Sequence, residues 1–257
     1  MHTAFFNLHT LKRHRERAAR RPDQRLWTFV GEEFRERLLP VNRSFSSVLD
    51  LSPQHFGGLS PVLKEGKLAD AQWTQASVHD GSLVQKESLK DYDLILSALD
   101  AHWIDDFPGF LRNVRDLLSP DGLFLCAFWG GQTLHELRHA LITAEGALGT
   151  IVHARVSPMI PMAVAARLLF EAGFVLPMVD QDTLPLTYPT LQGLVHHLRS
   201  MGETSALSQI APGTARLFRE AETVYRTLYP TPEGGVSATF ELITCTGWGP
   251  SMGRKNG

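Results

Sequence analysis

Asp50 closes the first buried strand predicted by the sequence, in the apolar segment 48–51. In α/β proteins, a carboxylate at the end of such a strand, followed by a sharp turn, is typical of the opening of a nucleotide-type cofactor site. Glycines normally occupy that turn, because they let the backbone approach a ligand without a Cβ clash. Here the glycines come late, after four larger residues: Pro53, Gln54, His55 and Phe56 precede Gly57 and Gly58. The pattern predicts a cofactor-binding fold whose first loop has been altered.

His102 and Trp103 form the second candidate site, just after the buried strand predicted at 91–98. Substrates of open α/β folds bind outside the carboxyl ends of the strands. An imidazole at that place can act as a base or orient a substrate. A structural role for the pair is the alternative interpretation.

Trp129, Gly130 and Gly131 follow the next predicted strand and precede a predicted helix. Backbone amides at the start of a helix can bind an anionic or amide group, so we place these three residues on the substrate side. Tyr188 is the fourth candidate there, as a residue that closes the pocket. Its alternative is a core tyrosine beside Pro189.

The segment 135–139 matches the zinc-binding pattern H-E-x-x-H. On a helix, His135 and His139 would share one face, and Glu136 would be the base. A third ligand is not evident in the sequence, and the segment follows a Gly-Gly turn. We therefore predict a polar helix face near a pocket rim, and no metal site.

The composition argues against several classes of protein. A formal net charge of -2 over 257 residues provides no field that favours nucleic acid or an anionic membrane. No apolar run approaches the roughly 20 residues of a membrane span. The basic run between Lys12 and Arg21 could bind an acidic partner, although a solvated helix face is the simpler interpretation. Cys126 and Cys245 lie in apolar, strand-like runs and are predicted to be reduced core residues.

Predicted helices and strands alternate along most of the chain, which indicates a mostly parallel α/β sheet with helices on both faces. The last predicted strand follows a Pro- and Gly-rich turn and could be antiparallel. Strands are expected at 47–51, 91–98, 123–129, 174–180 and 237–246. Helices are expected at 8–20, 26–39, 107–118, 133–145, 162–172, 190–200 and 216–228. We expect a single domain over 1–257, with N-terminal helices in 1–40 and a helical insertion at 182–230.

In four places the chain resembles class I S-adenosylmethionine-dependent methyltransferases. These places are 97–106, 119–124, 128–138, and Tyr188–Pro189 together with 201–203. The Pro-Asp-Gly turn is common in the whole superfamily. The Gly-Gly-x-Thr-Leu-x-Glu-Leu-Arg run and the Met-Gly-Glu are more specific to a branch that contains a respiratory complex I assembly factor; the biotin-pathway carrier-protein methyltransferases are also similar. The resemblance covers nearly the whole chain and implies a Rossmann-like methyltransferase sheet.

The resemblance implies that S-adenosylmethionine is the cofactor and that the carboxyl ends of the first strands hold it. The implied cofactor positions are Asp50, Ser52, Gly57, Asp80, Gly81, Ala98 and Leu99. Asp80–Gly81 best matches the third-strand position, which meets the adenine in the family. The ribose-binding acidic residue of the family has no convincing counterpart. Only about 43 residues separate Asp50 from the strand at Asp93, so one βα unit must be short or missing.

The implied function is that of a methyltransferase-like protein that acts on, or binds, a protein substrate and is related to complex I assembly. His102 would steer the nucleophile, because the methyl carbon is already electrophilic and alignment supplies most of the rate. The related assembly factor is linked to arginine hydroxylation rather than methylation. The altered loop supports a second hypothesis, a non-catalytic binding or assembly protein that kept the fold and lost the cofactor. The resemblance begins almost at the first residue, which favours a bacterial cytoplasm, with the mitochondrial matrix as the alternative.

Overall fold

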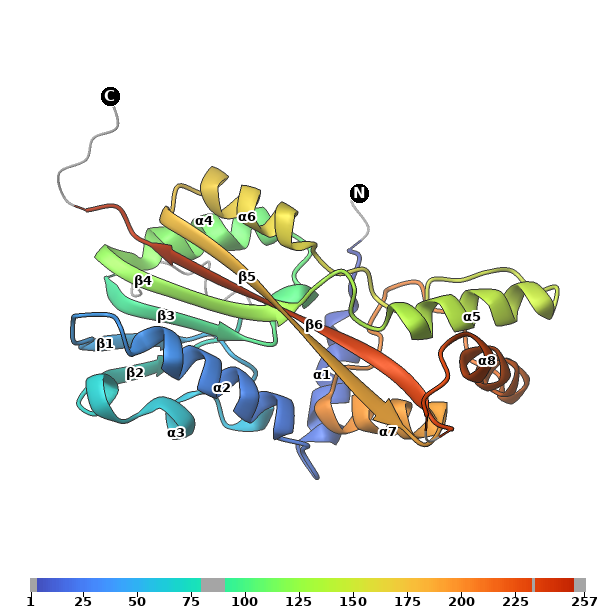
Figure 1. Ribbon diagram of the computed structural model, residues 1–257. Coiled ribbons are helices and arrows are strands. Elements are labelled where there is room, and N and C mark those ends of the chain that lie inside the picture. Colours follow the sequence, from blue (N-terminus) through green and yellow to red (C-terminus); the bar gives the residue numbers. More distant parts are fainter. Residues whose placement is uncertain (1–3, 80–90, 233, 252–257) are drawn as a thin grey trace. The chain divides into compact units, whose positions relative to one another are not determined.

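The computed structural model describes residues 4–79, 91–232 and 234–251, and the chain divides into two compact units. The helical unit comprises Met1–Asp23, Trp129–Met159 and Asp182–Leu242. The sheet unit comprises Gln24–Phe128, Ile160–Gln181 and Ile243–Gly257. Each unit is therefore built from three separate pieces of the chain (Figure 1).

The strands form a six-stranded sheet in the order β2-β1-β3-β4-β6-β5. The strands are β1 (Ser47–Asp50), β2 (Gln72–Gln75), β3 (Tyr92–Ala98), β4 (Leu118–Trp129), β5 (Val175–Tyr188) and β6 (Val236–Trp248). β1 is parallel to β2 and β3, and β3 is parallel to β4. Figure 1 shows β6 running opposite to β4 and β5, so the last strand is antiparallel. β5 and β6 contribute residues to both units. The predicted fold class is confirmed.

The helices lie close to the predicted ranges. The helical unit contains α1 (Leu8–Ala18), α5 (His135–Ala147), α7 (Leu191–Met201) and α8 (Ala215–Leu228). The sheet unit contains α2 (Arg25–Leu38), α3 (Ser60–Leu63), α4 (Phe107–Leu117) and α6 (Met162–Glu171), with short 3-10 turns η1 (Gln54–Phe56), η2 (Gly66–Leu68) and η4 (Ala101–Trp103). Capping sets several of these boundaries: Thr190 accepts the amide of Gly193 at the start of α7, and Gly202 ends that helix at a φ of 76°.

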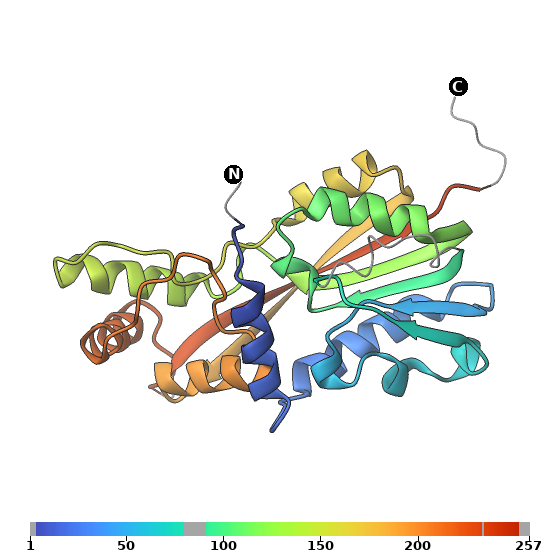
Figure 2. The ribbon, with the colours of Figure 1, turned by 180° about the vertical axis from the view of Figure 1, so that it is seen from behind.

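The sheet unit buries its strands on both faces. α2 covers one face, and α4 and α6 cover the other (Figures 1 and 2). The central strands are continuously apolar for this reason, as is typical of parallel strands between two helical layers. One core cluster joins strand and helix residues on the α4 and α6 side, among them Leu49, Ile95, Val114, Phe124 and Leu169.

The strand after β1 was not among the strands predicted from the sequence. Asp80–Gly81 were matched to the third-strand position of the family, whereas the structure places β2 earlier, at Gln72–Gln75, paired directly with β1. That is the second-strand position of a Rossmann-like sheet. β2 is the one strand between β1 and β3 within the part of the chain that the structure describes, in agreement with a shortened βα unit. Asp80 and Gly81 lie outside the described residues, and their role stays a prediction.

β5 is longer than predicted. It runs to Tyr188, so the first residues of the predicted insertion at 182–230 belong to a strand, while α7 begins at Leu191, close to the start predicted at 190. Pro185 interrupts the strand pattern in the sequence. In the structure, β5 lies at the edge of the sheet, where a strand tolerates proline. The Pro-Asp-Gly turn is likewise incorporated into β4, where Asp121 adopts a φ of 56° and the register with β3 shifts.

The core contains both cysteines as free thiols, and burial raises the pKa of Cys126 to about 12. No helix within 4–79, 91–232 and 234–251 is long and apolar enough to cross a membrane.

A buried ion pair fixes the segment that follows α5. The Glu145 carboxylate accepts hydrogen bonds from the His153 amide at 2.9 Å and from the Arg155 guanidinium at 2.9 Å. The same guanidinium donates to the Ala211 carbonyl at 2.8 Å. Burial alone would raise the pKa of Glu145, but these hydrogen bonds and the Arg155 charge lower it overall. The carboxylate therefore stabilises the folded state above its unfolded pKa of about 4.3, and this contribution disappears as the pH falls through the lower folded pKa.

Replacing Glu145 by glutamine is expected to lower the free energy of unfolding by about 1.5 kcal/mol at pH 7, because hydrogen bonds to a charged group are lost. The difference from the wild type should shrink as the pH falls below about 4.3 and vanish only once the pH is below the lower folded pKa. Urea denaturation at several pH values measures both effects. Glu171→Gln is the control, since its ion pair with Arg167 is exposed and should contribute little. A difference that persisted at low pH would contradict the assignment.

Candidate functional site

The loop after β1 is held by its own predicted cofactor residues. The Asp50 carboxylate accepts the Ser52 amide at 3.0 Å and the Leu59 amide at 2.6 Å. The Ser52 hydroxyl accepts the amide of Ala98, at the end of β3, at 2.9 Å. Burial raises the pKa of Asp50, while the hydrogen bonds from Leu59 and Ser52 act in the opposite direction. Asp50 is 2% exposed, so its buried carboxylate holds this loop in place from inside the protein.

The two late glycines complete the turn of this loop. Gly57 and Gly58 have φ values of 86° and 71°, a conformation that L side chains rarely adopt. A Cβ on Gly58 would lie 2.5 Å from the Gln75 amide nitrogen and 2.7 Å from the Asp50 carboxylate. A Cβ on Gly57 would meet nothing within 4 Å. The fold therefore requires a glycine at position 58 for lack of space, whereas the Cβ position of Gly57 faces open space.

Phe56 accounts for part of the altered loop. Its ring stacks on Trp27 of α2, with the centroids 4.9 Å apart and the planes inclined by 24°. Phe56 is 9% exposed. The aromatic residue that stands in place of a glycine thus belongs to the packing between the loop and α2.

The end of β3 carries the other predicted residues of the sheet unit. Leu99 has a φ of 52°, and its amide donates to the Ala127 carbonyl at 2.7 Å. His102 and Trp103 follow in η4, with their ring centroids 5.2 Å apart. Both are almost fully buried. The role of His102 as a base stays a prediction.

A histidine–carboxylate pair in the sheet unit escaped the sequence analysis. The Nε2 atom of His79 lies 2.7 Å from the Asp100 carboxylate. Asp100 is buried and directly follows Leu99, so the pair lies at the carboxyl end of β3. The signal was an acidic residue just after a buried strand, as at Asp50.

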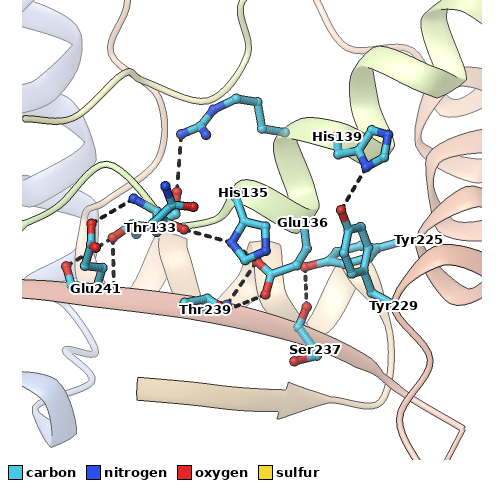
Figure 3. Close-up of polar contacts among 11 residues, drawn as sticks. Thr133, His135, Glu136, His139, Tyr225, Tyr229, Ser237, Thr239 and Glu241 are labelled. Atoms are coloured by element: carbon cyan, nitrogen blue, oxygen red, sulfur yellow. Dashed lines mark hydrogen bonds and ion pairs between the residues drawn. The ribbon is translucent and has the colours of Figure 1, made fainter. Parts of the chain in front are cut away.

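In the helical unit, Glu241 of β6 closes the turn that contains Gly130 and Gly131. Its carbonyl accepts the Gly130 amide at 2.7 Å, and its carboxylate accepts the Gln132 amide at 2.8 Å. Thr133 and the Glu241 backbone exchange two further hydrogen bonds, at 3.2 and 3.0 Å (Figure 3). The Gly130 amide, which we expected to serve a ligand, thus donates to a residue of the chain itself, as does the neighbouring amide of Gln132.

Glu136 of the H-E-x-x-H segment points at β6. Its carboxylate accepts the amide and the hydroxyl of Thr239, at 3.1 and 2.5 Å, and lies 3.4 Å from Nδ1 of His135 (Figure 3). Glu136 is 3% exposed, so the prediction of a polar helix face is wrong for this residue. It is buried because Thr239 and α8 cover this side of α5.

His139 of the same segment contacts α8. Its Nδ1 atom lies 2.8 Å from the hydroxyl of Tyr229, and the Tyr225 hydroxyl donates to the Ser237 carbonyl at 2.6 Å (Figure 3). Burial, followed by the charge of Glu136, raises the pKa of both tyrosines. Within the described residues, no group of three histidine, cysteine or acidic side chains is placed to hold a metal ion.

Tyr188 belongs to a row of contacting side chains in the helical unit that the sequence did not suggest. Its hydroxyl lies 2.5 Å from Nδ1 of His197, and Nε2 of His197 lies 3.6 Å from the Asp23 carboxylate. The His197 ring also contacts Phe240, which in turn contacts Trp129 at 5.3 Å between centroids. The structure therefore joins two predicted substrate residues, Trp129 and Tyr188, through one aromatic chain. The remaining described candidates, Asp50, Ser52, Gly57, Ala98, Leu99, His102 and Trp103, belong to the sheet unit.

No family model matches the chain. The arginine-hydroxylase NDUFAF5, mitochondrial, of Danio rerio is 30% identical over 239 residues, which cover 86% of this chain and 74% of the relative. The human protein of the same name is 30% identical over 252 residues, covering 90% and 73%. The malonyl-[acyl-carrier protein] O-methyltransferase of Halorhodospira halophila is 31% identical over 245 residues, covering 86% and 80%.

A solved structure supports the fold alone. A protein from Bacillus halodurans C-125, assigned as a methyltransferase, matches with a TM-score of 0.52 at 12% identity, covering 84% of this chain and 97% of that protein. This match supports the Rossmann-like methyltransferase fold of the chain, which departs from the family pattern in the shortened unit between β1 and β3. The chain therefore belongs to the class I S-adenosylmethionine-dependent methyltransferase superfamily, together with its NDUFAF5 and malonyl-[acyl-carrier protein] O-methyltransferase relatives.

Proposed function

We propose that the chain is an S-adenosylmethionine-binding member of this family that acts on a protein substrate in the assembly of respiratory complex I. The observation that carries the proposal is the ordered loop from Ser52 to Gly58, which Asp50 and Ser52 hold against the end of β3. One relative's name specifies a group carried on a protein, and the others' names specify arginine. Both support a substrate attached to a protein.

S-adenosylmethionine fits one part of this loop better than the rest. The open space beside Gly57 leaves room for a ligand against the backbone, and Ala98 and Leu99 end the neighbouring strand. The Asp50 carboxylate already accepts two amides of the loop, so its task is to hold the loop in shape. Gly57, Ala98 and Leu99 are therefore the residues proposed to hold the cofactor.

The cofactor, when bound, would supply an electrophilic methyl group. Proximity and alignment contribute most of the rate in such a transfer, so the protein's task is to hold the acceptor in line. His102 is the proposed residue for steering the acceptor from the sheet unit. Trp129, Gly130, Gly131 and Tyr188 are the proposed substrate residues of the helical unit.

The second candidate function is a non-catalytic binding or assembly protein with the same fold. The packing of Phe56 on Trp27 favours it, because a ring of the chain itself occupies the place of a family glycine in the loop. The Glu241 contacts with the glycine turn have the same implication on the substrate side.

Titration calorimetry with S-adenosylmethionine distinguishes the two functions. Binding at micromolar concentration supports the cofactor-binding function and contradicts the non-catalytic alternative. No binding up to millimolar concentration would overturn the first. Binding with transfer of a radioactive methyl group to a protein in a bacterial or mitochondrial extract would identify the catalytic form.

A matched pair of glycine variants tests whether the cofactor uses the loop. Gly57→Ala is expected to weaken cofactor binding at least about tenfold, equal to about 1.4 kcal/mol, because a methyl group fills the space proposed for the ligand. Gly66→Ala is the control, since Gly66 also has a positive φ and open space around its Cβ position. Equal affinities for the two variants would mean that the ligand does not approach Gly57.

A further inference from the structure

A groove between α7 and α8 is separate from every residue discussed so far as a candidate site. The two helices pack together within the helical unit (Figure 1). The groove encloses about 450 Å³. Its walls are residues of the first two turns of α7, Arg199, and one face of α8: Thr190, Leu191, Gln192, Val195, Arg199, Phe218, Arg219 and Glu222.

The floor of the groove is apolar. Leu191 is buried, Val195 is half-buried, and Phe218 is 40% exposed. A Cβ on Gly213 would lie 2.5 Å from the Phe218 ring, so the glycine lets this ring rest against the turn before α8. A partner that buries Phe218 would gain hydrophobic free energy from a side chain that solvent now covers in part.

Positive side chains outnumber negative ones around the floor of the groove. The Glu222 carboxylate is already used, because it accepts the Leu191 amide at 2.6 Å and the Arg226 guanidinium at 2.7 Å. The two exposed arginines of the groove, Arg199 and Arg219, form no ion pair with any described residue.

We propose that this groove docks an acidic segment of a partner protein, with an apolar side chain on Phe218 and carboxylates on Arg199 and Arg219. Guanidinium groups bind carboxylates through paired hydrogen bonds, which gives the contact direction as well as affinity. The proposal names the surface by which a protein substrate or partner would attach, and it shares with the proposed function only the premise that a protein binds. It requires no cofactor.

Fluorescence anisotropy of the full chain, without S-adenosylmethionine, tests the proposal. The probes are a labelled decapeptide in which glutamate alternates with leucine and an analogue with glutamine in place of glutamate. The acidic peptide should bind at least about tenfold more tightly than the analogue, and the R199E/R219E double variant should lose that preference. A peptide with lysine in place of glutamate should in turn bind the double variant, which excludes simple misfolding as the cause.

Arg216→Glu is the matched control, because Arg216 is exposed on the same helix but does not line the groove. Equal binding of the acidic and amide peptides would overturn the proposal, as would equal losses in the control and the double variant. Binding of a DNA duplex that requires Arg199 and Arg219, with no binding of the peptide, would overturn the assignment to a protein partner. Loss of S-adenosylmethionine binding leaves these outcomes unaffected, so the two proposals fail separately.

Discussion

Gly58→Ala is expected to lower the free energy of unfolding by about 4 kcal/mol and to abolish binding of S-adenosylmethionine. The positive φ of 71° costs an L residue roughly 1–2 kcal/mol. The added Cβ would also lie 2.7 Å from the Asp50 carboxylate, which Ser52 and Leu59 hold in place, and overpacking of this kind costs about 1–3 kcal/mol, whereas the exposed end of the Gln75 side chain can move away. Urea denaturation and calorimetry on the same preparation measure the two effects.

Gly57→Ala separates backbone strain from steric contact. Its φ is 86°, but its added Cβ would meet nothing within 4 Å. We therefore expect Gly57→Ala to cost only the roughly 1–2 kcal/mol of the backbone term. If the two variants were equally stable, the close approach of Gly58 to Asp50 would not matter to the fold.

Asp50→Ala is expected to lower the free energy of unfolding by about 3 kcal/mol. The amides of Ser52 and Leu59 lose their acceptor inside the protein, and each unsatisfied buried donor costs about 1–3 kcal/mol. Removal of a buried carboxylate, whose pKa burial raises, recovers part of that loss. The loop should become mobile as a result, and faster amide exchange of Leu59 would report it.

Asp70→Ala provides the comparison for Asp50→Ala. Asp70 lies on the exposed surface of the same unit, so its replacement should change stability by no more than about 0.5 kcal/mol. Asp50→Asn should fall between the two, since one amide oxygen can accept only part of what two carboxylate oxygens accept. An Asp50→Ala protein as stable as the wild type would show that the loop is held by other contacts.

Local patterns in the sequence predicted most of the elements but not their full lengths. Apolar spacing and caps placed α4, α6, α7 and α8 to within two residues, because those signals are local. β5 was predicted too short, since Pro185 interrupts the pattern and its position at the sheet edge depends on the whole fold. β2 is only four residues long and contains no continuous apolar run, so its pairing with β1 had no clear signal.

The candidate site was less predictable because its partners lie far apart in the chain. Asp50 was recognisable at the end of its strand, but its acceptance of the Leu59 amide depends on the path of the loop. The H-E-x-x-H pattern could not indicate that Glu136 accepts a hydrogen bond from Thr239, because Thr239 lies 103 residues later in the chain. The contacts of Glu241 with the glycine turn could not be predicted for the same reason.

The position of α1 has a consequence for how the chain acquires its structure. His14 of α1 hydrogen-bonds to Thr204, 190 residues later, and Phe6 forms a β-bridge with Leu207. During synthesis on the ribosome, α1 emerges well before α7 and must therefore wait for it before the two helices can pack together. Contacts of such high sequence separation slow folding, so the newly made chain carries the apolar side of α1 unprotected through most of its translation.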